Sequence, residues 1–312
     1  MLVSDFSDSL NVIIALILSG LPLSHLESDM TSFGEESCQL GLVPTIQAQF
    51  TILRLTALKL MGKVGDHEAV HTGDWIDEET LLSKVEGKGQ SMTLRDICTF
   101  RLSVAYICGD LVTAANMIDT LSEFPIANPM VVRIHLRQAF TGLAAFALSR
   151  KSDTRRNRKR YRGIANGVFR YFKKAAKKGS INSYPIYTLL LAERSPSKQK
   201  YDEAIRSCCK SGFKNFEAIA FERCGSWLLE SEKDSYWAKF YLSHALVRYK
   251  EWEAYGKVDQ LQNMYSLVDS KDDLFSKGTS FRGKKVHEGC AVAKTKILQL
   301  DGLPLVEKSG VT

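Results

Sequence analysis

The stretch that decides the fold is NFEAIAFERCGSWLLESEKDSYWAKFYLSHALVRYKEW, residues 215–252. Apolar and small residues recur in it at spacings of three and four, the period of an α-helix that buries one face. One such face contains Phe216, Ile219, Ala220, Cys224, Trp227 and Leu228, and the next contains Ala238, Tyr241, Leu242, Ala245, Leu246 and Tyr249. The connection between the two runs is short, so the sequence predicts an antiparallel pair of helices.

The same spacing extends through most of the chain, and no convincing alternating pattern of a β-strand accompanies it. Glycines at 20, 62 and 109 follow apolar runs, as residues that end helices do, and Asn215 and Asp234 stand where N-caps are expected. The pattern predicts helices over residues 8–19, 22–38, 42–62, 92–108, 110–122, 129–150, 155–178, 184–195, 199–211, 215–231, 234–250 and 254–267.

Small residues facing large aromatic ones recur every 34 to 40 residues, the interval of tetratricopeptide-like helix pairs. We therefore expect an all-α fold, a tetratricopeptide-like solenoid of antiparallel helix pairs. Its domain covers residues 1–268 and contains a long loop over about residues 63–91, which are rich in glycine and charge. Residues 269–312 are polar and irregular in pattern, and we expect a poorly ordered tail there.

Two motifs in the C-terminal half resemble a known family. Glu217, Ala218, Ala220 and Glu222 match an E-A-x-A-x-E pattern, and a second set matches the longer pattern that follows it in that family: Ala238, Tyr241, Leu242, Ala245, Tyr249, Trp252, Ala254, Lys257, Val258 and Leu261. The segment resembles the helical repeat region of large signalling proteins that also contain a serine/threonine kinase-like domain, a predicted AAA/STAND-type ATPase, and histidine kinase or cyclase modules. Glu253 replaces the glycine and Gly256 the alanine usual in that pattern.

The resemblance covers most of residues 10–267 and is strongest from about residue 184. It implies a non-catalytic scaffold or regulatory region of a signalling ATPase/kinase system, which would be a fragment of a larger protein or a stand-alone descendant. A protein partner or a neighbouring domain would occupy the groove of the solenoid. The family's kinase and ATPase motifs lie outside the matching stretch, so the resemblance supplies no catalytic residues.

A basic segment suggests a second function. Residues 150–178 contain 13 Lys and Arg and one acid, whereas the rest of the chain has 29 basic and 34 acidic residues, a net charge of −5. The predicted basic patch consists of Arg155, Arg156, Arg158, Lys159, Arg160, Arg162, Lys173 and Lys174. Such a run is typical of nucleic-acid binding or nuclear import, and also of a solvated helix face. A basic helical nucleic-acid-binding protein is therefore the alternative function.

The segment HEAVH, residues 67–71, has the spacing of a zinc hydrolase motif. On a helix, His67 and His71 would share one face, and the intervening glutamate would act on a zinc-bound water. Glycines and acids flank the motif, however, and no third ligand follows at a suitable spacing. Zinc-dependent hydrolysis is therefore a remote alternative, and incidental metal binding by a loop is favoured over it.

Other sequence features narrow the expected setting. The seven cysteines are scattered without a CxxC pair, which indicates a reducing compartment rather than a disulfide framework. The apolar run over residues 12–18 is too short to span a membrane. GTSFRGKK, residues 278–285, lacks the Ser or Thr that ends a phosphate-binding loop. We expect no cofactor, no membrane partner and a cytoplasmic location, with the basic run leaving a nuclear one open.

Overall fold

The computed structural model describes residues 11–17, 19–41, 44–63, 91–124 and 131–265. The chain divides into two units, residues 1–269 and 270–312, and all of the described residues lie in the first. Their regular structure is entirely helical. A short helix over residues 11–17 is followed by α2 (Leu23–Gln39), α3 (Pro44–Met61), α5 (Ser91–Cys108), α6 (Leu111–Ser122), α7 (Val131–Lys151), α8 (Arg155–Lys177), α9 (Ser183–Arg194), α10 (Lys198–Lys210), α11 (Lys214–Trp227), the π-helical turn η1 (Leu228–Glu232), α12 (Ser235–Glu251) and α13 (Tyr255–Tyr265).

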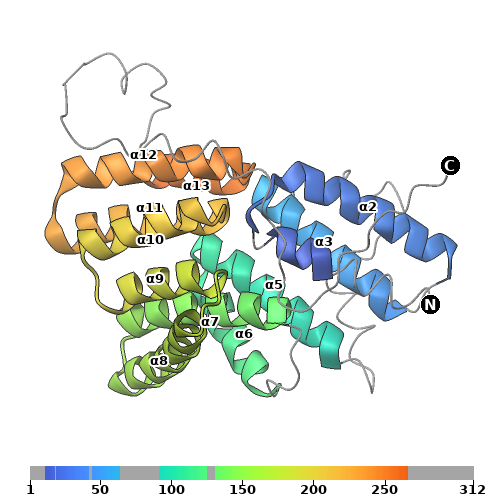
Figure 1. Cartoon of the computed structure of the whole chain (residues 1–312), viewed down its shortest axis with the longest axis horizontal. Coiled ribbons are helices and arrows are strands. Elements are labelled where there is room, and N and C mark those ends of the chain that lie inside the picture. Colours follow the sequence, from blue (N-terminus) through green and yellow to red (C-terminus); the bar gives the residue numbers. More distant parts are fainter. Residues whose placement is uncertain (1–10, 18, 42–43, 64–90, 125–130, 266–312) are drawn as a thin grey trace, which may run out of the picture. The chain divides into compact units, whose positions relative to one another are not determined.

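The helices pack as consecutive antiparallel pairs, which confirms the predicted all-α, solenoid-like fold (Figure 1). The pairs are α2 with α3, α5 with α6, α7 with α8, α9 with α10, and α11 with α12. Each pair also contacts the next, so that one hydrophobic core runs through the array. This is the arrangement in which each repeat buries the apolar face of its neighbour.

The first and second helices of the pairs differ in burial. Helices α5, α7, α9 and α11 are buried on nearly all sides, and α3 resembles them over its described side chains. By contrast, α8 and α10 are amphipathic and turn a polar face to solvent. Helices that are buried all round form an inner layer, and amphipathic helices cover it.

Most of the predicted helix ends are confirmed. Asp234 caps α12 by accepting a hydrogen bond from the backbone N–H of Trp237, and Gly20, Gly62 and Gly109 have the positive φ of C-terminal caps. The prediction for Asn215 was wrong, because α11 begins at Lys214 and Asn215 is buried. Its side-chain oxygen accepts from the backbone N–H of Phe216 at 2.8 Å, and its side-chain nitrogen donates to the carbonyl of Ile17 at 3.0 Å, which ties α11 to the first helix.

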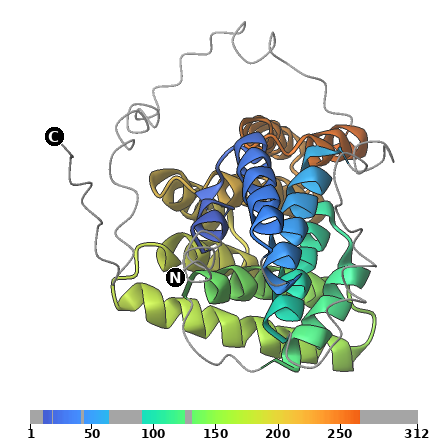
Figure 2. The ribbon, with the colours of Figure 1, turned by 90° about the vertical axis from the view of Figure 1, so that its right-hand side faces the viewer.

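The C-terminal helices return to the N-terminal ones, a contact that the sequence pattern did not predict. Helix α13 packs against α3 and α5, and the Gln260 side chain donates to the carbonyl of Cys108 at 2.6 Å. At the centre of this contact Gly62 faces Gly256, where a Cβ on Gly256 would lie 3.0 Å from the Gly62 backbone. In Figure 2, α2 and α3 (blue) lie beside the orange C-terminal helices.

The start of α2 is capped by residues from the far end of the described chain. The backbone N–H of Leu23 donates to the carbonyl of Trp252 at 3.2 Å, and that of Ser24 donates to the Glu253 carboxylate at 2.7 Å. Glu253 has a φ of 65°, in the left-handed region that favours glycine. The two departures from the family pattern, Glu253 and Gly256, therefore both lie where the two ends of the array meet.

We predict that Gly256→Ala destabilises the array, because the added Cβ would press on the backbone of Gly62 and on the Lys59 carbonyl, 3.2 Å away. Overpacking of this kind costs about 1–3 kcal/mol. Urea unfolding of the full chain would measure the change. Gly163→Ala is the matched control: it adds the same methyl group to a helix with nothing within 4 Å, and should slightly raise stability.

Candidate functional site: the basic face of α8

Helix α8 carries ten Lys and Arg in 23 residues and no acid. All eight residues of the predicted basic patch are exposed, and so are Arg170, Lys177 and, one residue beyond the helix, Lys178. Arg170 was missed from the sequence because it is separated from both charge clusters, although it lies one turn before Lys174. We call the exposed side formed by these eleven residues the basic face.

The opposite side of α8 holds the helix in the array. Its buried residues are Tyr161, Ala165, Val168, Phe169 and Phe172, and α8 packs on α7 and α9. At 100° per residue, most of the basic face lies opposite this apolar seam, whereas Arg158 in the first turn falls at the angle of Ala165 and Phe169. The seam therefore fixes the orientation of α8, whose cations are exposed. The helix itself lies at the outer edge of the array (Figure 1).

Few acids neutralise the basic face. Arg160 pairs with Asp119 of α6, and both side chains are about half exposed. Arg158 and Arg170 donate to backbone carbonyls, of Asp153 and Asn166, rather than to carboxylates. Exposed pairs such as Arg160 with Asp119 contribute little, so most of the positive charge remains directed at solvent.

The arrangement opposes helix stability in three ways. Arg155 and Arg156 occupy the first turn, where the helix dipole disfavours cations. Like charges stand four residues apart, as in Arg155 with Lys159 and Lys173 with Lys177, which is also unfavourable. Gly163 and Gly167 lie mid-helix with nothing within 4 Å of a Cβ, although glycine there costs about 1 kcal/mol relative to alanine.

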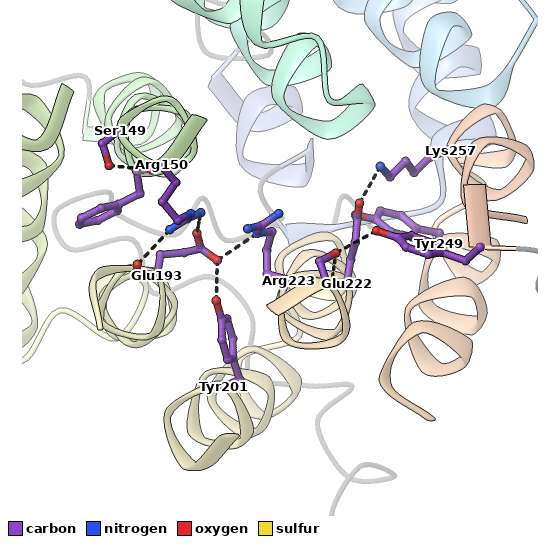
Figure 3. A network of polar contacts seen from close by, with 11 residues as sticks. Ser149, Arg150, Glu193, Tyr201, Glu222, Arg223, Tyr249 and Lys257 are labelled. Atoms are coloured by element: carbon purple, nitrogen blue, oxygen red, sulfur yellow. Dashed lines mark hydrogen bonds and ion pairs between the residues drawn. The ribbon is translucent and has the colours of Figure 1, made fainter. Parts of the chain in front are cut away.

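The charged side chains inside the array differ from those of the basic face, because most of them are paired with a group of opposite charge. Glu193 of α9 is fully buried and accepts hydrogen bonds from Arg150, from Arg223 at 3.1 Å and from the Tyr201 hydroxyl at 2.9 Å (Figure 3). Burial by itself would raise the pKa of Glu193, but Arg223 and Arg150 lower it to about 2. The carboxylate is therefore charged at neutral pH and links α7, α9, α10 and α11.

The residues of the family pattern form the neighbouring part of this network. Glu222 accepts from the Tyr249 hydroxyl at 2.6 Å and pairs with Lys257 at 2.8 Å, which joins α11, α12 and α13. Glu217 pairs with Arg248 at 2.9 Å. Burial raises the pKa of the nearby Tyr106, and the charge of Glu193 adds to this effect. These contacts give the residues of the sequence pattern a role in helix packing.

Three sequence and structural features bear on catalysis. The HEAVH segment with His67 and His71 lies outside the described residues, and no group of three or more His, Cys, Asp or Glu suitable for a metal occurs within them. A serine and a histidine do meet, with Ser183 Oγ 2.8 Å from His135 Nε2, but both are buried. A shallow pocket of about 210 Å³ lies among residues of α3, α5 and α6 and has a mixed lining.

Comparison with protein-family models, curated proteins and solved structures yields no match for this chain. Within the described ranges, no helix combines the length and the apolar character that crossing a membrane requires. The basic face of α8 is thus the described feature whose composition, orientation and lack of compensation most strongly indicate a binding role.

We predict that Glu193→Gln destabilises the fold by about 3 kcal/mol, because it leaves Arg150 and Arg223 without their carboxylate. The folded pKa of about 2 lies below the unfolded value, so the stabilisation is complete above about pH 4.5 and is lost as the pH falls toward 2. Chemical unfolding at pH 7, 4 and 3 should show a steeper acid loss for the wild type than for Glu193→Gln. Equal slopes would contradict this assignment.

For the HEAVH segment we predict that zinc content will not depend on its histidines. Metal analysis of tag-free protein should give the same substoichiometric zinc for the wild type and for a His67→Ala, His71→Ala variant. A full equivalent of zinc that disappears in the variant would revive the hydrolase hypothesis.

Proposed function

We propose that this helical array is a non-catalytic binding module that recruits an acidic macromolecule through the basic face of α8. The observation that carries the proposal is the exposure of eleven cations on α8 and its C-cap residue, most of them on one side, with an ion pair only at Arg160 among the described contacts of these residues. A surface whose charges serve only to keep the protein soluble usually mixes positive and negative side chains.

The loss of helix stability that the basic face causes also supports the proposal. Cations at the helix start, like charges at helical spacing and unfilled glycines all lower the stability of α8. Departures from local rules without a structural gain are expected at functional sites. An acidic polymer would turn the repulsion among these side chains into attraction.

The burial of the inner helices favours a binding surface on the outer layer of helices. A groove partner would need free surface on the inner helices, yet α5, α7, α9 and α11 are buried on nearly all sides by the chain's own residues. Helix α13 also packs on α3 and α5, so one end of the described array covers the other. The outer side of α8 needs no such rearrangement.

A second candidate is the regulatory scaffold of a signalling ATPase/kinase system. It is supported by the contacts of Glu217 with Arg248 and of Glu222 with Tyr249 and Lys257, which are made by residues of the family pattern. Cross-linking in source cells, followed by identification of the bound proteins, tests it. Recovery of no kinase or ATPase component would remove this candidate.

We predict opposite stability effects from matched charge reversals at the two ends of α8. Arg155→Glu with Arg156→Glu should raise the free energy of unfolding by about 1 kcal/mol, because acids suit the first turn. Lys174→Glu with Lys177→Glu should lower it, because cations suit the last turn. Urea unfolding measures both variants.

Both variants should bind heparin, a general polyanion, more weakly than the wild type at low salt, although their stabilities differ. The control reverses Lys210 and Lys239 on α10 and α12, which changes the net charge equally and should leave affinity nearly unaltered. Equal weakening by all three variants would show that only net charge matters, and absence of binding at low salt would refute the proposed function.

A further inference from the structure

Helix α9, which lies beside α8, is buried except for one stripe. All of its residues are buried apart from Tyr184, Tyr187, Leu191 and Arg194. Their spacing of three and four places these residues on a single side of the helix, and we call them the α9 stripe. Among the described side chains of the inner helices α5, α7, α9 and α11, only Tyr184 is a large hydrophobic group open to solvent, with 45% of its surface exposed.

Aromatic contacts join the α9 stripe to α8. The ring centroids of Tyr187 and of Phe169 on α8 lie 5.5 Å apart, and those of Tyr184 and Tyr187 lie 6.3 Å apart. The guanidinium carbon of Arg194 lies 4.7 Å from the centroid of the Phe169 ring. Aromatic rings and a guanidinium group therefore follow one another across the contact between the two helices.

Phe169 also brings the stripe next to the cations of the basic face. Lys173 follows Phe169 by four residues and Arg162 precedes it by seven, which places them about 40° and 20° from it around the helix. Both side chains are exposed, whereas the Phe169 ring is buried. The edge of the basic face thus runs alongside the rings of the α9 stripe.

Helix α10 borders the stripe on its other side, so that α9 lies between α8 and α10 (Figure 1). The Tyr184 hydroxyl donates to the Glu203 carboxylate of α10 at 3.4 Å. Arg206 pairs with the same carboxylate at 2.8 Å. The acid beside the exposed ring is therefore already paired with a cation, which reduces its repulsion of an approaching anion.

We infer that the acidic macromolecule is a single-stranded nucleic acid, with its phosphates on the cations of α8 and its bases stacked on Tyr184 and Tyr187. This inference rests on the proposed function and specifies its partner. Proteins that bind single strands combine a positively charged surface with aromatic side chains on which successive bases stack. The exposed guanidinium group of Arg194 offers a base a further stacking surface.

The exposed rings favour this partner over other polyanions. The bases of a duplex are paired and stacked on one another, so an aromatic side chain reaches their faces only after the duplex opens. Heparin and acidic peptides interact with the cations but carry no bases. An anionic membrane would also attract the cations, but interfacial binding grows with the apolar area that is buried, and the stripe offers a single well-exposed ring.

The test measures binding of the full chain to labelled strands of about 16 nucleotides by fluorescence anisotropy. The probes are oligouridylate, oligodeoxythymidylate and an abasic strand with the same number of phosphates. We expect each base-containing strand to bind at least about fivefold more tightly than the abasic strand at equal salt, because stacking of even one base supplies that factor. The tighter of the two base-containing strands identifies the sugar of the natural partner.

The decisive variant is Tyr184→Leu, which removes the exposed ring without changing any charge. Affinity for the base-containing strands should fall at least about fivefold, while that for the abasic strand stays the same because charge alone decides it. Tyr184→Phe retains the ring and loses only the contact with Glu203, so it should bind like the wild type. Tyr236→Leu is the matched control, since it removes a ring that is 76% exposed on α12, away from the stripe.

Circular dichroism and urea unfolding confirm that each variant folds. Equal affinity for base-containing and abasic strands would overturn the inference, as would unchanged binding by Tyr184→Leu or equal loss in Tyr236→Leu. Tighter binding of a DNA duplex, or of vesicles that contain phosphatidylserine, would overturn it as well. In these cases heparin binding by the basic face would leave the proposed function standing, whereas failure to bind any strand or heparin at low salt would refute both.

Discussion

The contact between the two ends of the array is the constraint on which the rest of the structure depends. The first N–H groups of α2 have no side-chain cap of their own, and they are satisfied by the Trp252 carbonyl and the Glu253 carboxylate. The backbone contact of Gly62 with Gly256 brings α13 onto α3. Because these contacts join segments about 200 residues apart, the helices between them share a single core.

The burial of the inner helices explains why the charges of the described residues fall into two classes. Inner helices that are buried on all sides can retain a charged group only if it is paired, because an isolated buried charge is very costly. Glu193 with Arg150 and Arg223, and Glu222 with Lys257, meet that requirement. On α8 the requirement does not apply, since the side chains reach water and their charges can remain uncompensated.

The sequence predicted the helices well because each buries an apolar face, and that periodicity is local. Closure was not predictable in the same way, since a glycine such as Gly256 carries no periodic signal and its partner Gly62 is remote in the chain. Asn215 was misassigned for a related reason: its side-chain nitrogen donates to the distant carbonyl of Ile17, and its side-chain oxygen accepts from the neighbouring N–H of Phe216 rather than from a residue two or three positions on. Composition located the basic segment, but only the orientation of the apolar seam of α8 showed that most of its cations share one side and that Arg170 belongs with them.

The glycines inside the helices show which positions helix packing restricts to glycine and which it does not. A Cβ on Gly225 would lie 2.6 Å from the Leu242 side chain, and one on Gly142 would lie 2.7 Å from that of Val168, so helix packing requires both. Gly163 and Gly167 carry the same cost to helix stability, yet no neighbouring atom fills the space that they leave. Packing within the array therefore gives no reason for glycine at these two positions. The proposed binding role offers one, since a low helix surface among exposed cations would let an anionic polymer approach closely where the surrounding charge attracts it most strongly.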